Sequence, residues 1–121
     1  MSAAVYYWTS LDKLLETTGN NYPVFIELLH QYLQSAPAML DELEKATLLG
    51  DQASILHHAH SLKSCLALIG SRQTQQRMAA IEKQAAALIV SQDIDFAVIR
   101  SELKQIEYEI KLYLSKAENR L

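Results

Sequence analysis

Two side chains that can handle a phosphoryl group lie one helical turn apart near the middle of the chain. His60 supplies an imidazole, which is a good nitrogen nucleophile near neutral pH, and Lys63 follows it at i+3. Residues at this spacing are neighbours on a helix, so the ammonium can reach groups attached to the ring. A transferred phosphoryl group carries its charge on three oxygens, which a mobile cation stabilises. The pair therefore predicts a phosphoryl acceptor with its stabilising cation.

The helix that carries this pair must bury one face and expose another. The apolar residues that define its buried direction are Ile55, Ala59, Leu62, Leu66 and Ile69. At 100° per residue His60 points about 140° away from that direction, into solvent. Small side chains near the same bearing would let a partner approach the ring. We expect the docking surface around His60 to consist of Ser64, Ala67, Leu68 and Ser71.

Leu68 also points away from the buried face, about 140° to the other side. An apolar residue exposed beside a reactive group is commonly a partner contact. The alternative is that Leu68 folds under the loop to the next helix. Cys65 has a bearing towards the interior, which predicts a small core residue and not a nucleophile.

A third candidate lies on the following helix. If the Nε2 atom of His60 attacks the phosphoryl group, its Nδ1–H needs an acceptor. Glu82 on an antiparallel neighbour can supply one, which would fix the tautomer and the ring orientation. The alternatives are ordinary: an exposed helix charge for Glu82, a solvated charge for Lys63 and a plain surface residue for His60.

Glycine, proline and capping residues divide the chain into five helical segments. The first runs from about Ser10 to Gly19, the second from Asn21 to Gly50 and the third from Asp51 to Gly70; the fourth begins at Ser71 and the fifth at Asp93 or Asp95. Pro37 predicts a bend or a short break in the second segment. The apolar stripes extend to Leu48 in the second segment, to Leu88 and Ile89 in the fourth, and from Val98 in the fifth.

The connections between these segments have two to five residues, which makes neighbouring helices antiparallel. The predicted fold is all-α: an up-and-down antiparallel four-helix bundle with a short N-terminal helix packed on it. At 121 residues, half of them hydrophobic, the chain is expected to form one domain over residues 1–121.

Composition excludes several classes of function. The net charge of -3 without a basic cluster argues against nucleic-acid binding. The longest apolar run, residues 85–90, is too short for membrane insertion. No secretion signal is evident and there is a single cysteine, so we expect a cytoplasmic protein.

The remaining motifs argue against a resident metal or nucleotide. His57 and His60 could hold a metal ion loosely, but no carboxylate matches their spacing and no CxxC or HExxH pattern exists, so we predict no metal site. With Gly only at positions 19, 50 and 70, there is no glycine-rich loop for ATP. The chain is therefore not expected to be an enzyme with its own ATP site.

The run from His60 through Leu62, Lys63 and Ser64 to Gly70 resembles the signature of histidine phosphotransfer (HPt) domains. In that signature the accepting His is followed by an aliphatic residue, Lys, a small residue and, ten positions on, Gly. The likeness extends over most of residues 10–91. In the family the position of Ser64 is most often Gly, and a hydroxymethyl there would narrow the set of partners that fit.

The resemblance implies a phosphocarrier in a multistep phosphorelay. His60 would accept a phosphoryl group from a receiver-domain aspartate and pass it to the aspartate of another receiver. The partners implied are receiver domains of response regulators or hybrid sensor kinases. No bound cofactor is implied, because the receiver supplies Mg²⁺. The alternatives are the phosphorylatable domain of a chemotaxis-type kinase, or a helical adaptor that has lost phosphotransfer.

Overall fold

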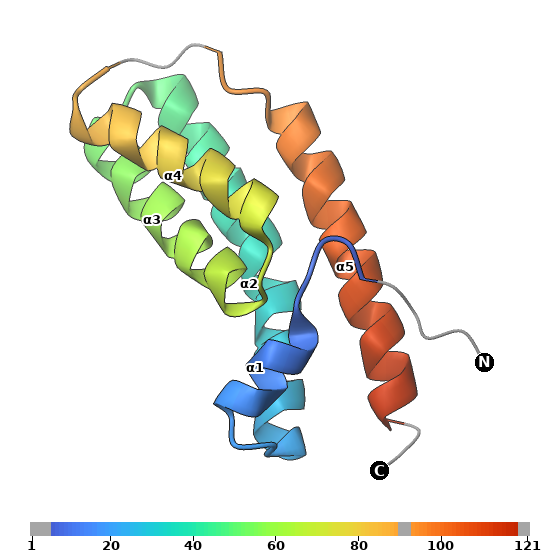
Figure 1. The fold of residues 1–121 in the computed structure, drawn as a ribbon. Coiled ribbons are helices and arrows are strands. Elements are labelled where there is room, and N and C mark those ends of the chain that lie inside the picture. Colours follow the sequence, from blue (N-terminus) through green and yellow to red (C-terminus); the bar gives the residue numbers. More distant parts are fainter. Residues whose placement is uncertain (1–5, 90–92, 119–121) are drawn as a thin grey trace.

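A computed structural model describes residues 6–89 and 93–118, with the side chains of residues 117 and 118 left undescribed, and within these ranges the chain is all-helical without a strand. The helices are α1 (Leu11–Thr17), α2 (Tyr22–Leu49), α3 (Gln52–Leu68), α4 (Arg72–Ala86) and α5 (Phe96–Glu118), as Figure 1 shows. The all-helical fold class and the five predicted segments are confirmed.

Local capping chemistry explains where these helices begin and end. The side chains of Asn21, Asp51 and Asp95 each accept a hydrogen bond from the backbone N–H three residues further on. Asp95, and not Asp93, is therefore the residue that starts α5. Gly50 ends α2 with φ of 66°, in the left-handed region that glycine adopts without strain.

The short break expected at Pro37 is absent, and the expected extent of the fourth segment is wrong. The 28 residues of α2 form one helix that passes through Pro37 without a break. Pro37 is exposed, so the backbone bond that it removes is lost on a face where water can compensate. In contrast, α4 ends at Ala86, and Leu88 adopts a φ of 57°. The helical phase therefore does not continue to Leu88 and Ile89.

Several residues of the predicted apolar stripes are exposed, and all of them lie near helix ends. Leu88 is 74% exposed and Ile89 is 56% exposed, because both lie beyond the end of α4. Leu48 is 83% exposed in the last turn of α2, and Val98 is 37% exposed near the start of α5. The apolar stripes are buried along the middle of the helices and are exposed at these positions near the helix ends.

The core lies between α2, α3, α4 and α5, and α3 packs against both α2 and α4 (Figure 1). Fully buried side chains come from all four of these helices and include Phe25, Leu29, Leu43, Leu62, Leu66, Met78, Ile106 and Ile110. Burying each such side chain stabilises the fold by about 1.5–3 kcal/mol. α1 packs on α2. The finer arrangement, a regular up-and-down four-helix bundle, stays a prediction.

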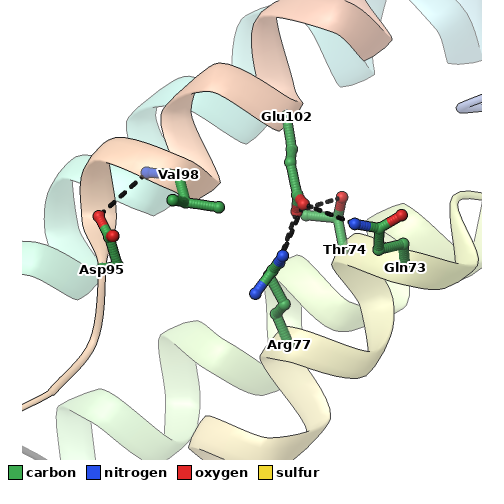
Figure 2. A network of polar contacts seen from close by, with 6 residues as sticks. All are labelled: Gln73, Thr74, Arg77, Asp95, Val98 and Glu102. Atoms are coloured by element: carbon green, nitrogen blue, oxygen red, sulfur yellow. Dashed lines mark hydrogen bonds and ion pairs between the residues drawn. The ribbon is translucent and has the colours of Figure 1, made fainter.

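Buried carboxylates fasten α5 to its surroundings. Glu102 accepts hydrogen bonds from Thr74 Oγ1 at 3.0 Å, Gln73 Nε2 at 3.1 Å and Arg77 Nε at 2.8 Å, which ties α5 to α4 (Figure 2). Both Glu102 and Thr74 are buried. This cluster holds the last helix against the helix that carries Glu82.

A second buried carboxylate fixes the segment that precedes α1. Glu109 accepts hydrogen bonds from the backbone N–H groups of Tyr7 and Trp8 and from the hydroxyl of Thr9. Residues 7–9 therefore lie against α5, about a hundred positions away in the sequence. Among the described residues no helix is long and apolar enough to cross a membrane.

Candidate functional site

His60 lies on the outer face of α3 with its side chain 60% exposed. Its Nδ1 atom is 2.8 Å from Glu82 Oε1 on α4. A carboxylate oxygen can only accept, so Nδ1 carries the hydrogen and donates it. In the neutral ring the lone pair is then on Nε2, which is the nitrogen left free to attack an electrophile.

Glu82 holds the lysine as well as the imidazole. Its second oxygen, Oε2, is 2.5 Å from Lys63 Nζ, and both side chains are partly buried, at 20% and 29% exposed. Lys63, and next His60, lower the pKa of the Glu82 carboxyl, so this group stays ionised at neutral pH. One carboxylate thus links the two groups whose chemistry the sequence singled out.

The backbone accounts for this convergence. His60 and Lys63 are i, i+3 neighbours on α3, on either side of the buried Leu62. Glu82 follows the buried Ile81 on α4, the helix that packs most extensively on α3. Burial of Leu62 and Ile81 between the helices directs the polar residues beside them to the shared edge of the α3–α4 contact.

Three of the four predicted docking residues are exposed. Ser64, Ala67 and Leu68 all face solvent, and Leu68 is 43% exposed, so it does not fold under the α3–α4 loop. The hydroxyl of Ser64 donates to the backbone carbonyl oxygen of His60 at 3.1 Å. Because that hydroxyl turns back onto its own helix, Ser64 adds little bulk beside the imidazole.

The prediction for Ser71 is wrong, because its side chain is only 1% exposed. The 100° phase of α3 stops at Gly70, whose φ of 70° ends the helix. The segment before α1 then covers the turn: the Ser10 backbone N–H donates to the carbonyl of Ile69 at 2.8 Å. Ser71 therefore lies under other chain segments and not on the docking surface.

Gly70 is required by the same packing. A Cβ atom at this position would lie 2.5 Å from the Cβ of Ser10, well inside contact distance, in a conformation that L side chains rarely adopt. The glycine that closes the sequence motif thus lets Ser10 pack against the α3–α4 turn. The sequence held no signal for this contact, because it joins positions 60 residues apart.

The other reactive groups lie apart from this site. Cys65 is half-buried with its Sγ 3.9 Å from Met39 Sδ, and burial raises the pKa of its thiol, which disfavours the reactive thiolate. The rings of His57 and His58 contact each other edge to face, with 5.2 Å between their centroids. In the described part of the chain no three His, Cys, Asp or Glu side chains gather as metal ligands would.

Comparison with known proteins gives two matches. A family model described as the Hpt domain matches residues 27–111, a range that includes His60, Lys63 and Glu82. A solved structure of the HPT domain from an Hpt sensor hybrid histidine kinase from Shewanella aligns with a TM-score of 0.76 and 23% sequence identity, covering 93% of this chain and 97% of that one. This second likeness shows the fold. No curated protein matches the chain.

Proposed function

This chain belongs to the Hpt domain family, and from that premise we propose that it is a phosphocarrier whose His60 accepts a phosphoryl group from a receiver-domain aspartate and passes it to another. Membership of the family supports a phosphorelay role and a module without its own ATP site. We further propose that residues 1–121 act as one domain built on an up-and-down four-helix bundle.

The observation that carries the proposal is the 2.8 Å contact between His60 Nδ1 and Glu82 Oε1. It orients the ring and assigns the hydrogen to Nδ1, which makes Nε2 the nucleophile. In a surface histidine without a role, the ring would turn freely and both tautomers would exchange. Here the carboxylate does for the imidazole what the acid of a catalytic triad does, and stabilises positive charge as the ring forms its new bond.

The proposed transfer exchanges one bond for another. Nε2 of His60 forms a bond to phosphorus while the bond from phosphorus to the aspartyl oxygen of the receiver breaks, and the aspartate leaves as a carboxylate. The receiver brings the Mg²⁺ that neutralises charge on the moving group. The reverse step, on a second receiver, returns His60 to its neutral state.

Lys63 has a more specific part in this proposal. Its ammonium rests on Glu82 Oε2 when no phosphoryl group is present. The flexible stem of a lysine lets the charge move from the carboxylate to the phosphoryl oxygens when His60 is modified. Glu82 would then keep its contact with Nδ1 alone, so the lysine changes partner while the ring stays oriented.

The direct test uses a receiver domain charged with labelled phosphate. Incubated with this chain, it should lose label while acid-labile label appears on the chain, and His60→Gln should accept none. His57→Gln is the matched control, because among the described residues this neighbouring imidazole has no carboxylate contact like that of His60. Label retained in His60→Gln would contradict the proposal.

Two alternatives predict other results in the same assay. A phosphorylatable domain of a chemotaxis-type kinase would take label from a kinase domain with ATP and not from a receiver. A helical adaptor would bind a receiver without taking label from it. No described contact favours either alternative over the phosphocarrier.

A further inference from the structure

A groove of about 470 Å³ separates α1 from the last turns of α3 and the start of α4. Its walls include Lys13 and Leu14 of α1, Ser64, Ala67 and Leu68 of α3, and Arg72 of α4. Three of these residues, on α3, are the exposed side chains expected to surround His60 in a docking surface. The groove therefore continues that surface away from the imidazole and towards α1.

The charge of this groove is of one sign. Among the described residues that line it, Lys13 and Arg72 alone are ionisable, and both are exposed. Within residues 6–89 and 93–116 neither side chain forms an ion pair or a hydrogen bond. Arg77, Arg100 and Lys63, by contrast, are each held by a carboxylate. The groove is thus flanked by two cations without a carboxylate partner among the described residues, on a chain of net charge -3.

The α3 wall of the groove is mainly apolar. Ala67 and Leu68 are exposed, and the hydroxyl of Ser64 is turned back onto its own helix. An exposed apolar strip bounded by charges has the composition of a protein-docking surface, in which apolar contacts lie at the centre and charges lie at the rim.

The position of the groove fits a partner that is centred on His60. With a rise of 1.5 Å per residue, Ser64 lies about 6 Å and Leu68 about 12 Å along α3 from His60. A standard interface covers about 800 Å² of each partner, or a disc about 16 Å in radius. A receiver that brings its aspartate to His60 therefore also reaches the α3 wall of this groove.

We propose that the groove between α1 and the end of α3 selects among receivers, by taking a receiver surface that places an acidic side chain between Lys13 and Arg72. This inference rests on the proposed function. The two cations act at the rim, where charges steer association and discriminate between partners more than they add affinity. A receiver with a basic side chain at that place would be disfavoured by like-charge repulsion.

The test compares the double variant Lys13→Glu, Arg72→Glu with wild type and with a charge-matched control, the double variant Lys45→Glu, Lys104→Glu, whose exposed lysines lie outside the groove. Receivers encoded in the same genome are charged with acetyl phosphate and Mg²⁺, and the rate of transfer to each chain is measured at low and high salt. Labelling of His60 by phosphoramidate, a small donor that needs no docking surface, is measured in parallel.

We expect the groove variant to accept phosphate from the preferred receiver roughly tenfold more slowly than the control at low salt, with a gap that closes near 1 M salt, where the Debye length is about 3 Å. Phosphoramidate labelling should be equal in all three chains. Equal rates of phosphoryl transfer from the receiver to the groove variant and to the control would contradict the proposed role of the groove, but not the phosphocarrier function. A wild-type chain that takes phosphate from no receiver would overturn the proposed function and this inference with it.

Discussion

Replacing Glu102 by alanine should destabilise the fold more than any change to a surface charge. The carboxylate is 5% exposed and accepts hydrogen bonds from three side chains of α4 (Figure 2). Removing it strands the hydroxyl of Thr74, which is fully buried and cannot turn to water. Arg77, whose side chain is 42% exposed, and the exposed Gln73 can regain solvent.

The expected loss of stability follows from this difference between the buried Thr74 hydroxyl and the two partners that can regain solvent. A stranded buried hydroxyl costs about 1–3 kcal/mol, and the lost contact to a half-exposed arginine adds about 0.5–1 kcal/mol. We expect Glu102→Ala to lower the free energy of unfolding by about 1.5–4 kcal/mol, a fall of roughly 1–2 M in the urea midpoint. Circular dichroism at increasing urea concentration measures it.

Two further variants make this result interpretable. Glu107→Ala breaks an exposed i, i+4 pair with Lys111 and should cost only about 0.3–0.5 kcal/mol. Glu102→Met combined with Thr74→Val replaces both buried partners with apolar groups of similar shape, and should recover much of the loss. A midpoint for Glu102→Ala equal to that of Glu107→Ala would refute the reasoning.

Three other outcomes are expected. Lys63→Ala should slow phosphoryl transfer to His60 roughly ten- to a hundredfold at little cost in stability, because one charge contact to the phosphoryl group is lost. Rapid-quench kinetics would measure the rate. An unchanged rate would mean that Lys63 is an ordinary surface charge. Lys63 and His60 lower the pKa of Glu82 in the folded chain, so the ionised carboxylate stabilises the fold. This contribution to the free energy of unfolding is fully present above the unfolded-state pKa of about 4.3 and is lost as the pH falls through the lower folded-state pKa. Urea midpoints between pH 6 and pH 3 should therefore fall more for wild type than for Glu82→Gln, and parallel curves would contradict this. The Tyr32 hydroxyl is buried and finds no hydrogen-bond partner among the described residues, so Tyr32→Phe should leave thermal stability unchanged or raise it; a clear loss would mean that the hydroxyl has a partner.

Local rules predicted most of the fold. Asn21, Asp51 and Asp95 cap their helices through contacts three residues long, and such contacts can be read directly from the sequence. The same holds for the exposed position of His60, which follows from helical phase. The proximity of Glu82 needed one further assumption, that the fourth segment runs antiparallel to the third.

Long-range contacts account for what the sequence did not reveal. Ser71 is buried in the α3–α4 turn, against which Ser10 packs, and nothing in the local sequence pattern indicates that contact. Glu102 and Glu109 are also buried, and their hydrogen-bond partners lie 25 to 102 positions away in the sequence. The prediction for Leu88 is wrong for a different reason, because the apolar sequence pattern continues past the point at which the backbone leaves the helix.

The phosphorylated nitrogen itself tests the central claim most directly. The chain, with ¹⁵N-labelled histidine, is phosphorylated by a charged receiver, and the ring nitrogens are followed by NMR at alkaline pH, where phosphohistidine persists. The account predicts one modified ring, His60, with phosphorus on Nε2 and with Nδ1 still protonated against Glu82. Phosphorus on Nδ1 of His60, or on His57 or His58, would contradict it.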